Sequence, residues 1–185
     1  MSTLSSPLGP KYHLPTTLDL STPSSTPEVH PSSMPPFVYR VHRARAQTQY
    51  DFSTGFRAKN QTTIINQVSL ISRFGLAHLH QQTNISSPFI SVYRSQAHAE
   101  EVARYFARLY DEDTWVVTID TNHLSRGPVF WAANLLQGQE LSAAQAWLHE
   151  GEYLCLYRIS PQAIRDQTRV VRKEARSYGV IGGRR

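Results

Sequence analysis

Two glutamates separated by one glycine, Glu150 and Glu152, are the pair of residues in this sequence best placed to do chemistry together. They stand directly before a run rich in Leu, Tyr, Cys and Ile, which is typical of a buried strand. If the chain is already extended there, side chains alternate and both carboxylates lie on one face of the sheet. Like charges at this distance repel, so folding must supply a cationic partner, a bound ligand or open water. A solvated acidic strand end is the simpler structural alternative.

An arginine in the middle of an apolar strand is the second candidate. Residues 37–42 alternate directly after two prolines, which predicts a short strand. One face carries Phe37, Tyr39 and Val41, and the other carries Val38, Arg40 and His42. Because an unpaired buried charge is costly, Arg40 needs a partner. An internal carboxylate, which would be structural, and a ligand phosphate, which would be functional, both remain open.

A serine between two aromatic residues is the third candidate. Residues 89–93 predict another strand, with Ser91 on the same face as Phe89 and Tyr93. A hydroxyl on a buried face must find a hydrogen-bond partner. The backbone and a catalytic group would meet that need equally well.

Composition predicts one globular domain. The chain has 185 residues, of which 40% are hydrophobic and 10% aromatic, enough for a real core. Its single cysteine, Cys155, excludes an internal disulfide and reads as a small core residue rather than a nucleophile. The histidines show no Cys/His spacing suited to zinc, so no metal site is predicted.

The chain is basic, with a formal net charge of +5 and a pI of about 9.6. Much of the excess lies near the C-terminus, which favours acidic partners such as nucleic acid, a phosphorylated cofactor or a membrane surface. No run is long and apolar enough to cross a membrane, and no signal peptide is evident. The expectation is an intracellular protein without a membrane partner.

The order of the elements predicts an α+β fold. Residues 1–35 read as a disordered Ser/Thr/Pro-rich leader, 36–175 as the domain and 176–185 as a basic flexible tail. Strands are expected over 37–42, 89–93, 115–120, 152–159 and 168–172, a loop over 42–60, and helices over 62–80, after the N-cap Ser95, and over 130–136 and 142–148. These alternate without strict βαβ order, and no glycine-rich nucleotide loop is present.

Three of these segments, taken in chain order, resemble a known family. They are the arginine strand, the strand Ser87-Pro88-Phe89-Ile90-Ser91-Val92 preceded by Leu76-Ala77-His78-Leu79, and the segment Glu150-Gly151-Glu152. Over residues 37–165 this order resembles the R-S-E class of mono-ADP-ribosyltransferases, the cholera- and pertussis-toxin-like family. It is also similar to fungal proteins of unassigned role that share the pattern SPFIS…EYL…RI. The resemblance implies an NAD-binding split β-sandwich with flanking helices.

The resemblance also assigns roles to individual residues. Arg40, on a cofactor-binding strand with Tyr39 and Val41, would hold an NAD phosphate, and Ser91 would brace the nicotinamide pocket. Glu152 would be the catalytic glutamate, stabilising positive charge that builds on the ribose as its bond to nicotinamide breaks. Glu150 would help to choose the acceptor. Two positions depart from the family's Ser-Thr-Ser pattern, since Val92 and Tyr93 replace its last two residues.

The implied function is an NAD-dependent transfer of ADP-ribose to a protein, with arginine as a candidate acceptor and NAD as substrate. Two alternatives remain. The departures at Val92 and Tyr93 favour a catalytically inactive interaction module on the same fold. The arginine-rich C-terminus favours a nucleic-acid-binding domain, although few aromatic residues accompany it.

Overall fold

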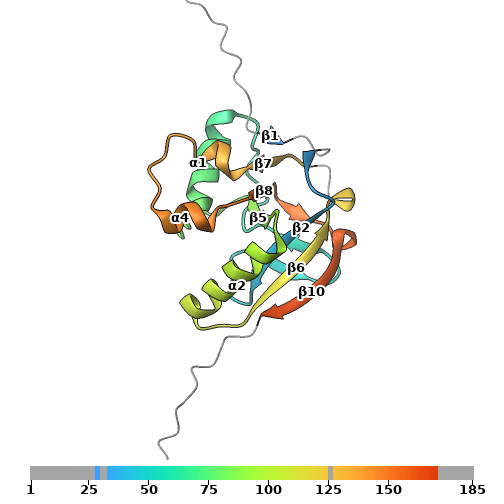
Figure 1. The fold of residues 1–185 in the computed structure, drawn as a ribbon. Helices are drawn as coiled ribbons and strands as arrows, with labels where there is room; N and C mark the ends of the chain where they lie inside the picture. The colour runs from blue at the N-terminus through green and yellow to red at the C-terminus, as the bar shows by residue number, and fades with distance from the viewer. Residues whose placement is uncertain (1–27, 30–32, 125–126, 171–185) are drawn as a thin grey trace, which may run out of the picture.

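The computed structural model describes residues 28–29, 33–124 and 127–170, and over these ranges a large and a small antiparallel sheet pack together with four α-helices (Figure 1). In spatial order, the large sheet contains β1 (Glu28–Val29), β7 (Val129–Trp131), β8 (Glu152–Leu156), β5 (Phe89–Tyr93), β2 (Phe37–Arg43), β6 (Thr114–Asp120) and β10 (Ile164–Val170). The small sheet contains β3 (Gln49–Asp51), β4 (Gly55–Arg57) and β9 (Arg158–Ile159). The expected α+β class is confirmed.

The large sheet is nearly divided where β2 meets β5. Strand β2 pairs with β6 along its whole length, but it pairs with β5 only through Tyr39 and Tyr93. Beyond that pair the two strands separate, so β2–β6–β10 and β5–β8–β7–β1 form two halves joined at a seam. This arrangement is consistent with the expected split β-sandwich.

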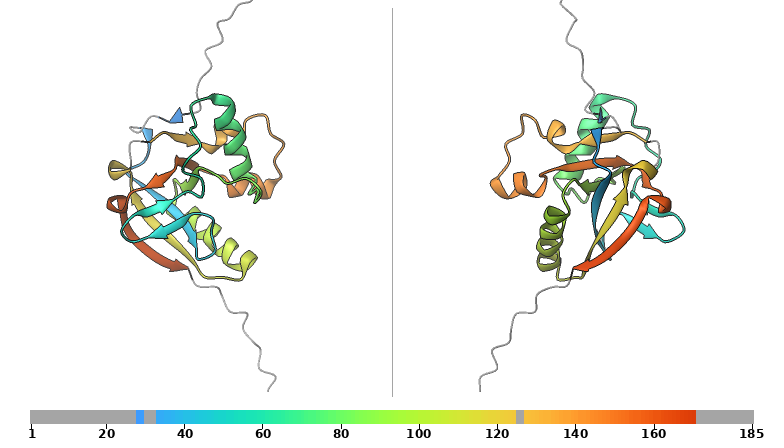
Figure 2. Two further views of the ribbon diagram at one scale, coloured as in Figure 1. Left: turned by 180° about the vertical axis from the view of Figure 1, so that it is seen from behind. Right: turned by 45° about the vertical axis from the view of Figure 1, so that its right-hand side comes forward.

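The helices cover the two halves separately. Helix α2 (Gln96–Tyr110) packs on β2 and β6, and the small sheet lies on the opposite face of these strands (Figure 2). Helices α1 (Val68–Leu79) and α3 (Ala132–Leu135) pack together beside the other half, and α4 (Ala143–Leu148) leads into β8. The predicted cap of α2 is confirmed, since the Ser95 hydroxyl accepts a hydrogen bond from the amide of His98 at 3.3 Å.

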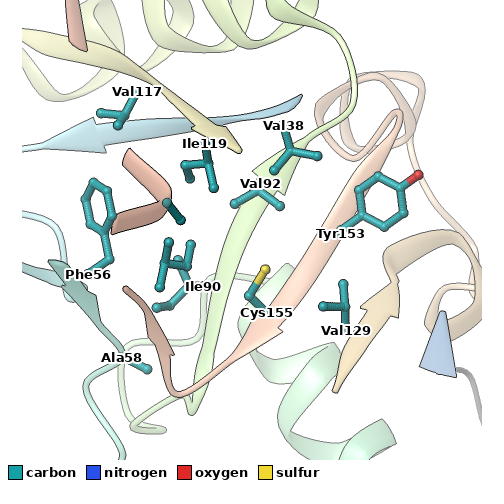
Figure 3. Packing of buried hydrophobic residues seen from close by; sticks show 12 residues of the cluster. Val38, Phe56, Ala58, Ile90, Val92, Val117, Ile119, Val129, Tyr153 and Cys155 are labelled. Atoms are coloured by element: carbon teal, nitrogen blue, oxygen red, sulfur yellow. The ribbon is translucent and has the colours of Figure 1, made fainter. Parts of the chain in front are cut away.

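The main hydrophobic core fills the space between the two sheets. Val38, Val92 and Ile119 extend toward one another from three strands of the large sheet, and Phe56 meets them from the small sheet (Figure 3). Cys155 belongs to the same cluster, and burial raises the pKa of its thiol to about 12. The prediction that this cysteine is a core residue is therefore confirmed.

Several predicted boundaries differ from those in the structure. The expected loop 42–60 contains β3 and β4, residues 28–29 of the expected leader pair with β7, and residues 130–131, where the expected helix began, belong to β7. Gly75 lies inside α1, where a Cβ would come within 2.7 Å of the Leu135 Cδ1 atom, so the close approach of α1 to α3 favours glycine at this position. Residues 168–170 of the expected strand 168–172 lie in β10, which begins at Ile164, whereas residues 171–172 and the basic tail 176–185 lie outside the described residues.

Replacing Gly55 with alanine is expected to destabilise the small sheet by several kcal/mol. Gly55 has φ of +75°, and a Cβ there would lie 2.2 Å from the carbonyl oxygen of Ile159. Gly138 is a matched control, since its φ is +79° but a Cβ would meet no atom within 4 Å. Gly138→Ala should therefore cost only about 1 kcal/mol. The free energy of unfolding in urea measures both, and equal losses would contradict the close contact at Gly55.

Candidate functional site

A cavity of about 430 Å³ lies at the seam between the two halves of the large sheet. Four of the six predicted site residues line it, namely Arg40, Val41, Ser91 and Glu152. They come from β2, β5 and β8, so three segments distant in sequence meet around one hollow. Tyr39 and Glu150 are not among the lining residues.

Arg40 is a buried cation with incomplete hydrogen bonding. Its side chain is 7% exposed, its Nη1 donates to the carbonyl oxygen of Ser91 at 2.8 Å, and its Nε is buried without a partner among the described residues. Desolvation lowers the pKa of Arg40 to about 10, although the nearby Tyr93 and Glu152 oppose that shift, so the group is still charged at neutral pH. In the described residues no carboxylate pairs with it. The site suits an anionic ligand group.

Glu152 is almost completely buried at the start of β8, opposite Tyr93 in the sheet. Its Oε2 lies 2.6 Å from Nδ1 of His149, and both side chains are below one-tenth exposed. A carboxylate that is desolvated but hydrogen-bonded keeps a fixed direction and interacts strongly with any cation in the cavity. The negative charge of Glu152 raises the pKa of Arg40 and so opposes the decrease caused by burial, which shows that the two side chains lie close enough to interact electrostatically.

The chain turns between the two glutamates, so the expectation that they share one face is wrong. Gly151 has φ of +62°, and its carbonyl oxygen accepts a hydrogen bond from the amide of Arg94 at 2.8 Å. Glu150 therefore lies in a turn rather than in an extended strand, and its side chain is exposed. The prediction failed because it assumed that the strand begins before Glu150, whereas β8 begins at Glu152.

Ser91 finds its hydrogen bond on helix α1. Its hydroxyl lies 2.8 Å from Nε2 of His78, a second histidine that lines the cavity. Burial lowers the pKa of His78 to about 4, with a further decrease from Arg40 and an opposing effect from Glu152, so the ring is neutral at pH 7. Of the alternatives left open by the sequence, a side-chain partner rather than the backbone satisfies this serine.

The two departures from the Ser-Thr-Ser pattern have different consequences. Val92 points into the core between the sheets, away from the cavity, because alternate residues of β5 face opposite sides. Tyr93 lies on the cavity side and is 4% exposed, and burial raises the pKa of its hydroxyl. Only the second departure therefore changes the cavity lining.

The remaining charged residues make the cavity positive. Arg43, Arg45 and Lys59 line it together with Arg40, whereas Glu112 and Glu152 are the lining carboxylates. Arg43 pairs with Glu112 at 2.7 Å, and its guanidinium lies 3.7 Å from the ring centre of Tyr110. The balance favours a ligand that carries negative charge.

Sequence reasoning missed the roles of His78 and His149. His78 was visible within the segment Leu76-Ala77-His78-Leu79, as a polar residue in an apolar stretch of helix. His149 stands three residues before Glu152, a spacing that brings two side chains together across a turn. Neither contact could be read from the sequence without knowing where α1 packs and where β8 begins.

The free energy of unfolding is expected to fall as the pH is lowered from about 6.5 to about 4, because unfolding allows His78 to bind a proton. A histidine whose pKa is lower in the folded state than in the unfolded state leaves the protein at its full stability above the unfolded pKa. That stability is lost progressively as the pH falls from the unfolded pKa to the folded pKa. Each such group changes the free energy of unfolding by about 1.4 kcal/mol per pH unit in this window.

Urea unfolding at several pH values would measure this slope in wild type and in His78→Gln, which should decline less steeply. His42, whose pKa burial lowers to about 4, keeps some slope in the variant. His80→Gln is a matched control on the exposed end of α1 and should keep the wild-type slope. A His78→Gln slope equal to wild type would contradict the burial of a neutral ring.

The chain belongs to a family of domains of unknown function, DUF7587, whose sequence profile matches residues 33–172. Among solved structures, a chain named EcPltA is similar, with 17% sequence identity and a TM-score of 0.48 over 72% of this chain and 75% of that one. Comparison with curated proteins gave no match. Within the described residues, every helix is too short or too polar to cross a membrane.

Proposed function

We propose that this domain binds NAD and transfers its ADP-ribose group to a protein. The observation that carries the proposal is the convergence of Arg40, Ser91 and Glu152 on one cavity, in the chain order of the R-S-E class. The same three residues could have been scattered over separate surfaces. The positive lining and the unpaired Nε of Arg40 further support a ligand with phosphate groups.

Two charged groups of the cavity, Arg40 and Glu152, have defined roles in the proposed reaction. Arg40 binds the pyrophosphate, where a guanidinium matches paired oxygens. The bond between C1′ of the ribose and the pyridinium nitrogen breaks, and its electron pair leaves with nicotinamide, which becomes neutral. The ribose ring gains positive charge, and the buried carboxylate of Glu152 stabilises that charge more in the transition state than in the ground state.

The acceptor completes the reaction by attacking C1′, and its proton passes to the carboxylate of Glu150. Glu150 is exposed on the turn between α4 and β8, where an incoming protein would meet it more readily than a small molecule in the cavity would. A carboxylate in that place suits a cationic acceptor such as arginine, which it would orient by bidentate hydrogen bonds. Arginine is therefore the acceptor that we propose to test first.

The test is incubation of the purified chain with NAD labelled in the adenylate half, with and without candidate acceptor proteins. We expect release of nicotinamide, measured by chromatography, and label on protein that is stable to denaturation. An arginine-rich acceptor and the same acceptor with lysine in place of arginine identify the modified side chain. Failure to bind NAD by calorimetry, together with no nicotinamide release, would contradict the proposal.

A second function is an interaction module that keeps the cavity without turnover. Two observations favour it: Tyr93 occupies a position where the family has serine, and Ser91 contacts His78 instead of Glu152. Calorimetry separates the two functions. Binding of NAD without release of nicotinamide would support the module, and turnover would exclude it.

A further inference from the structure

The closest polar contact of Glu152 is a histidine on its own turn. Nδ1 of His149 lies 2.6 Å from Oε2 of Glu152, and their side chains are 7% and 3% exposed. A carboxylate only accepts hydrogen bonds, so the proton between them is assigned to Nδ1. Oε1 of Glu152 accepts no hydrogen bond from the stretches of chain that the structure describes.

The turn that joins α4 to β8 fixes this pair. His149 ends α4, where its amide donates to the carbonyl oxygen of Gln145 at 3.2 Å. The amide of Glu152 in turn donates to the carbonyl oxygen of His149 at 3.3 Å. Gly151, with its positive φ, closes the turn. The two side chains therefore meet within one short turn, which the hydrogen bond from the Arg94 amide to the Gly151 carbonyl oxygen ties to the end of β5.

Among the described residues, the Ser91 hydroxyl contacts His78 and makes no hydrogen bond to Glu152. In this protein the hydrogen bond to the buried carboxylate comes instead from His149. We infer that His149 is the positioning residue for Glu152, directing its free oxygen into the cavity and setting the charge that the pair presents to the substrate. This inference rests on the proposed function, because it names the residue on which Glu152 depends in that reaction.

The charge of the pair follows from the protonation of the imidazole. With a neutral ring, the pair carries one negative charge to stabilise the cationic ribose. With a second proton on Nε2, the pair is neutral overall and that stabilisation weakens. The titratable groups that face the pair are Arg40 from β2, Tyr93 from β5 and His78 from α1. Of these, Arg40 is positive at neutral pH, whereas Tyr93 and His78 are uncharged. None of the three exchanges a proton with the pair near neutral pH, so the net charge of the pair depends on His149 and Glu152 alone.

Two substitutions separate the hydrogen bond from the charge. Asparagine places an amide N–H near the position of Nδ1 but does not titrate, whereas leucine has a similar size and no donor. We expect His149→Leu to lower kcat for nicotinamide release by a factor on the order of 10–100, with the Kd for NAD within about threefold of wild type. His149→Asn should recover most of that loss, and its kcat should lack the decline at acidic pH that wild type shows.

Three results would overturn the inference: wild-type kcat in His149→Leu, an unchanged pH profile in His149→Asn, or equal losses in both variants. Thermal unfolding confirms that each variant is folded before kinetics are compared. A second measurement does not depend on NAD turnover. The chemical shift of the Glu152 carboxyl carbon, followed by NMR at neutral pH, should change in His149→Leu, which loses the hydrogen-bond donor, and much less in His149→Asn. Equal chemical shifts in all three proteins would overturn the pairing itself, even if the proposed reaction failed.

Discussion

Glu152→Gln is expected to lower kcat for nicotinamide release by a factor of roughly 10²–10³ while leaving the Kd for NAD almost unchanged. Glutamine keeps the size of the side chain and one acceptor oxygen, but it removes the negative charge. Because the charge acts on a cation that exists only near the transition state, its loss should appear in kcat rather than in binding. Nicotinamide release at saturating NAD measures the first quantity, and calorimetry measures the second.

Glu101→Gln is a matched control for this substitution. Glu101 is exposed on α2, so the same chemical change there should leave both kcat and Kd at their wild-type values. A Glu152→Gln variant that turns over NAD at the wild-type rate would remove Glu152 from the reaction. Equal losses in the two variants would point to a general effect of removing one negative charge from the protein rather than to the buried carboxylate.

Arg40→Met is expected to weaken NAD binding by roughly 100-fold, because two hydrogen bonds from a guanidinium to phosphate are worth about 3 kcal/mol. The same substitution should change the free energy of unfolding by little or raise it. Replacing a buried, incompletely paired charge with an apolar side chain of similar volume is often neutral or stabilising. A loss of ligand affinity without a loss of stability is the result that a binding residue, but not a structural one, gives.

Calorimetry and urea unfolding on the same preparation measure these two quantities. Arg108→Met is the matched control, since Arg108 is exposed in the last turn of α2 and away from the cavity lining. It should bind NAD as wild type does. If Arg40→Met unfolds at much lower urea concentration, then the guanidinium holds the seam together through Ser91, and its role is structural.

The longer strands could be predicted from the sequence because their patterns are strong. β2, β5 and β6 are five to seven residues long, and each follows or precedes a clear turn signal. The short strands β3, β4 and β9 have two or three residues, too few for a periodicity to be visible. The expected strand 152–159 is broken at Tyr157, whose φ of +61° sends the chain from the large sheet into the small one. A tyrosine gives no local sign of such a turn.

The candidate site, like the fold, could be predicted from the sequence only in part. Arg40, Ser91 and Glu152 could be found because their residue types and order match a family pattern, and the structure brings all three to one cavity. Glu150 was placed wrongly because Gly151 allows a left-handed conformation that ends the strand early. His78 and His149 depend on the position of a helix and on the closure of a turn. Both are tertiary features that residue types alone do not determine.

The burial of Cys155 gives the protein a chemical reporter of its own opening. Its sulfur lies in the core between the sheets, its pKa of about 12 keeps it protonated, and the sequence contains no other thiol. Because the thiol is buried, an alkylating reagent can reach it only when the sheets separate. Opening also lets the thiol form the reactive thiolate. The rate of labelling, followed by mass spectrometry with and without a ligand in the cavity, therefore measures how often the domain opens, without any added probe.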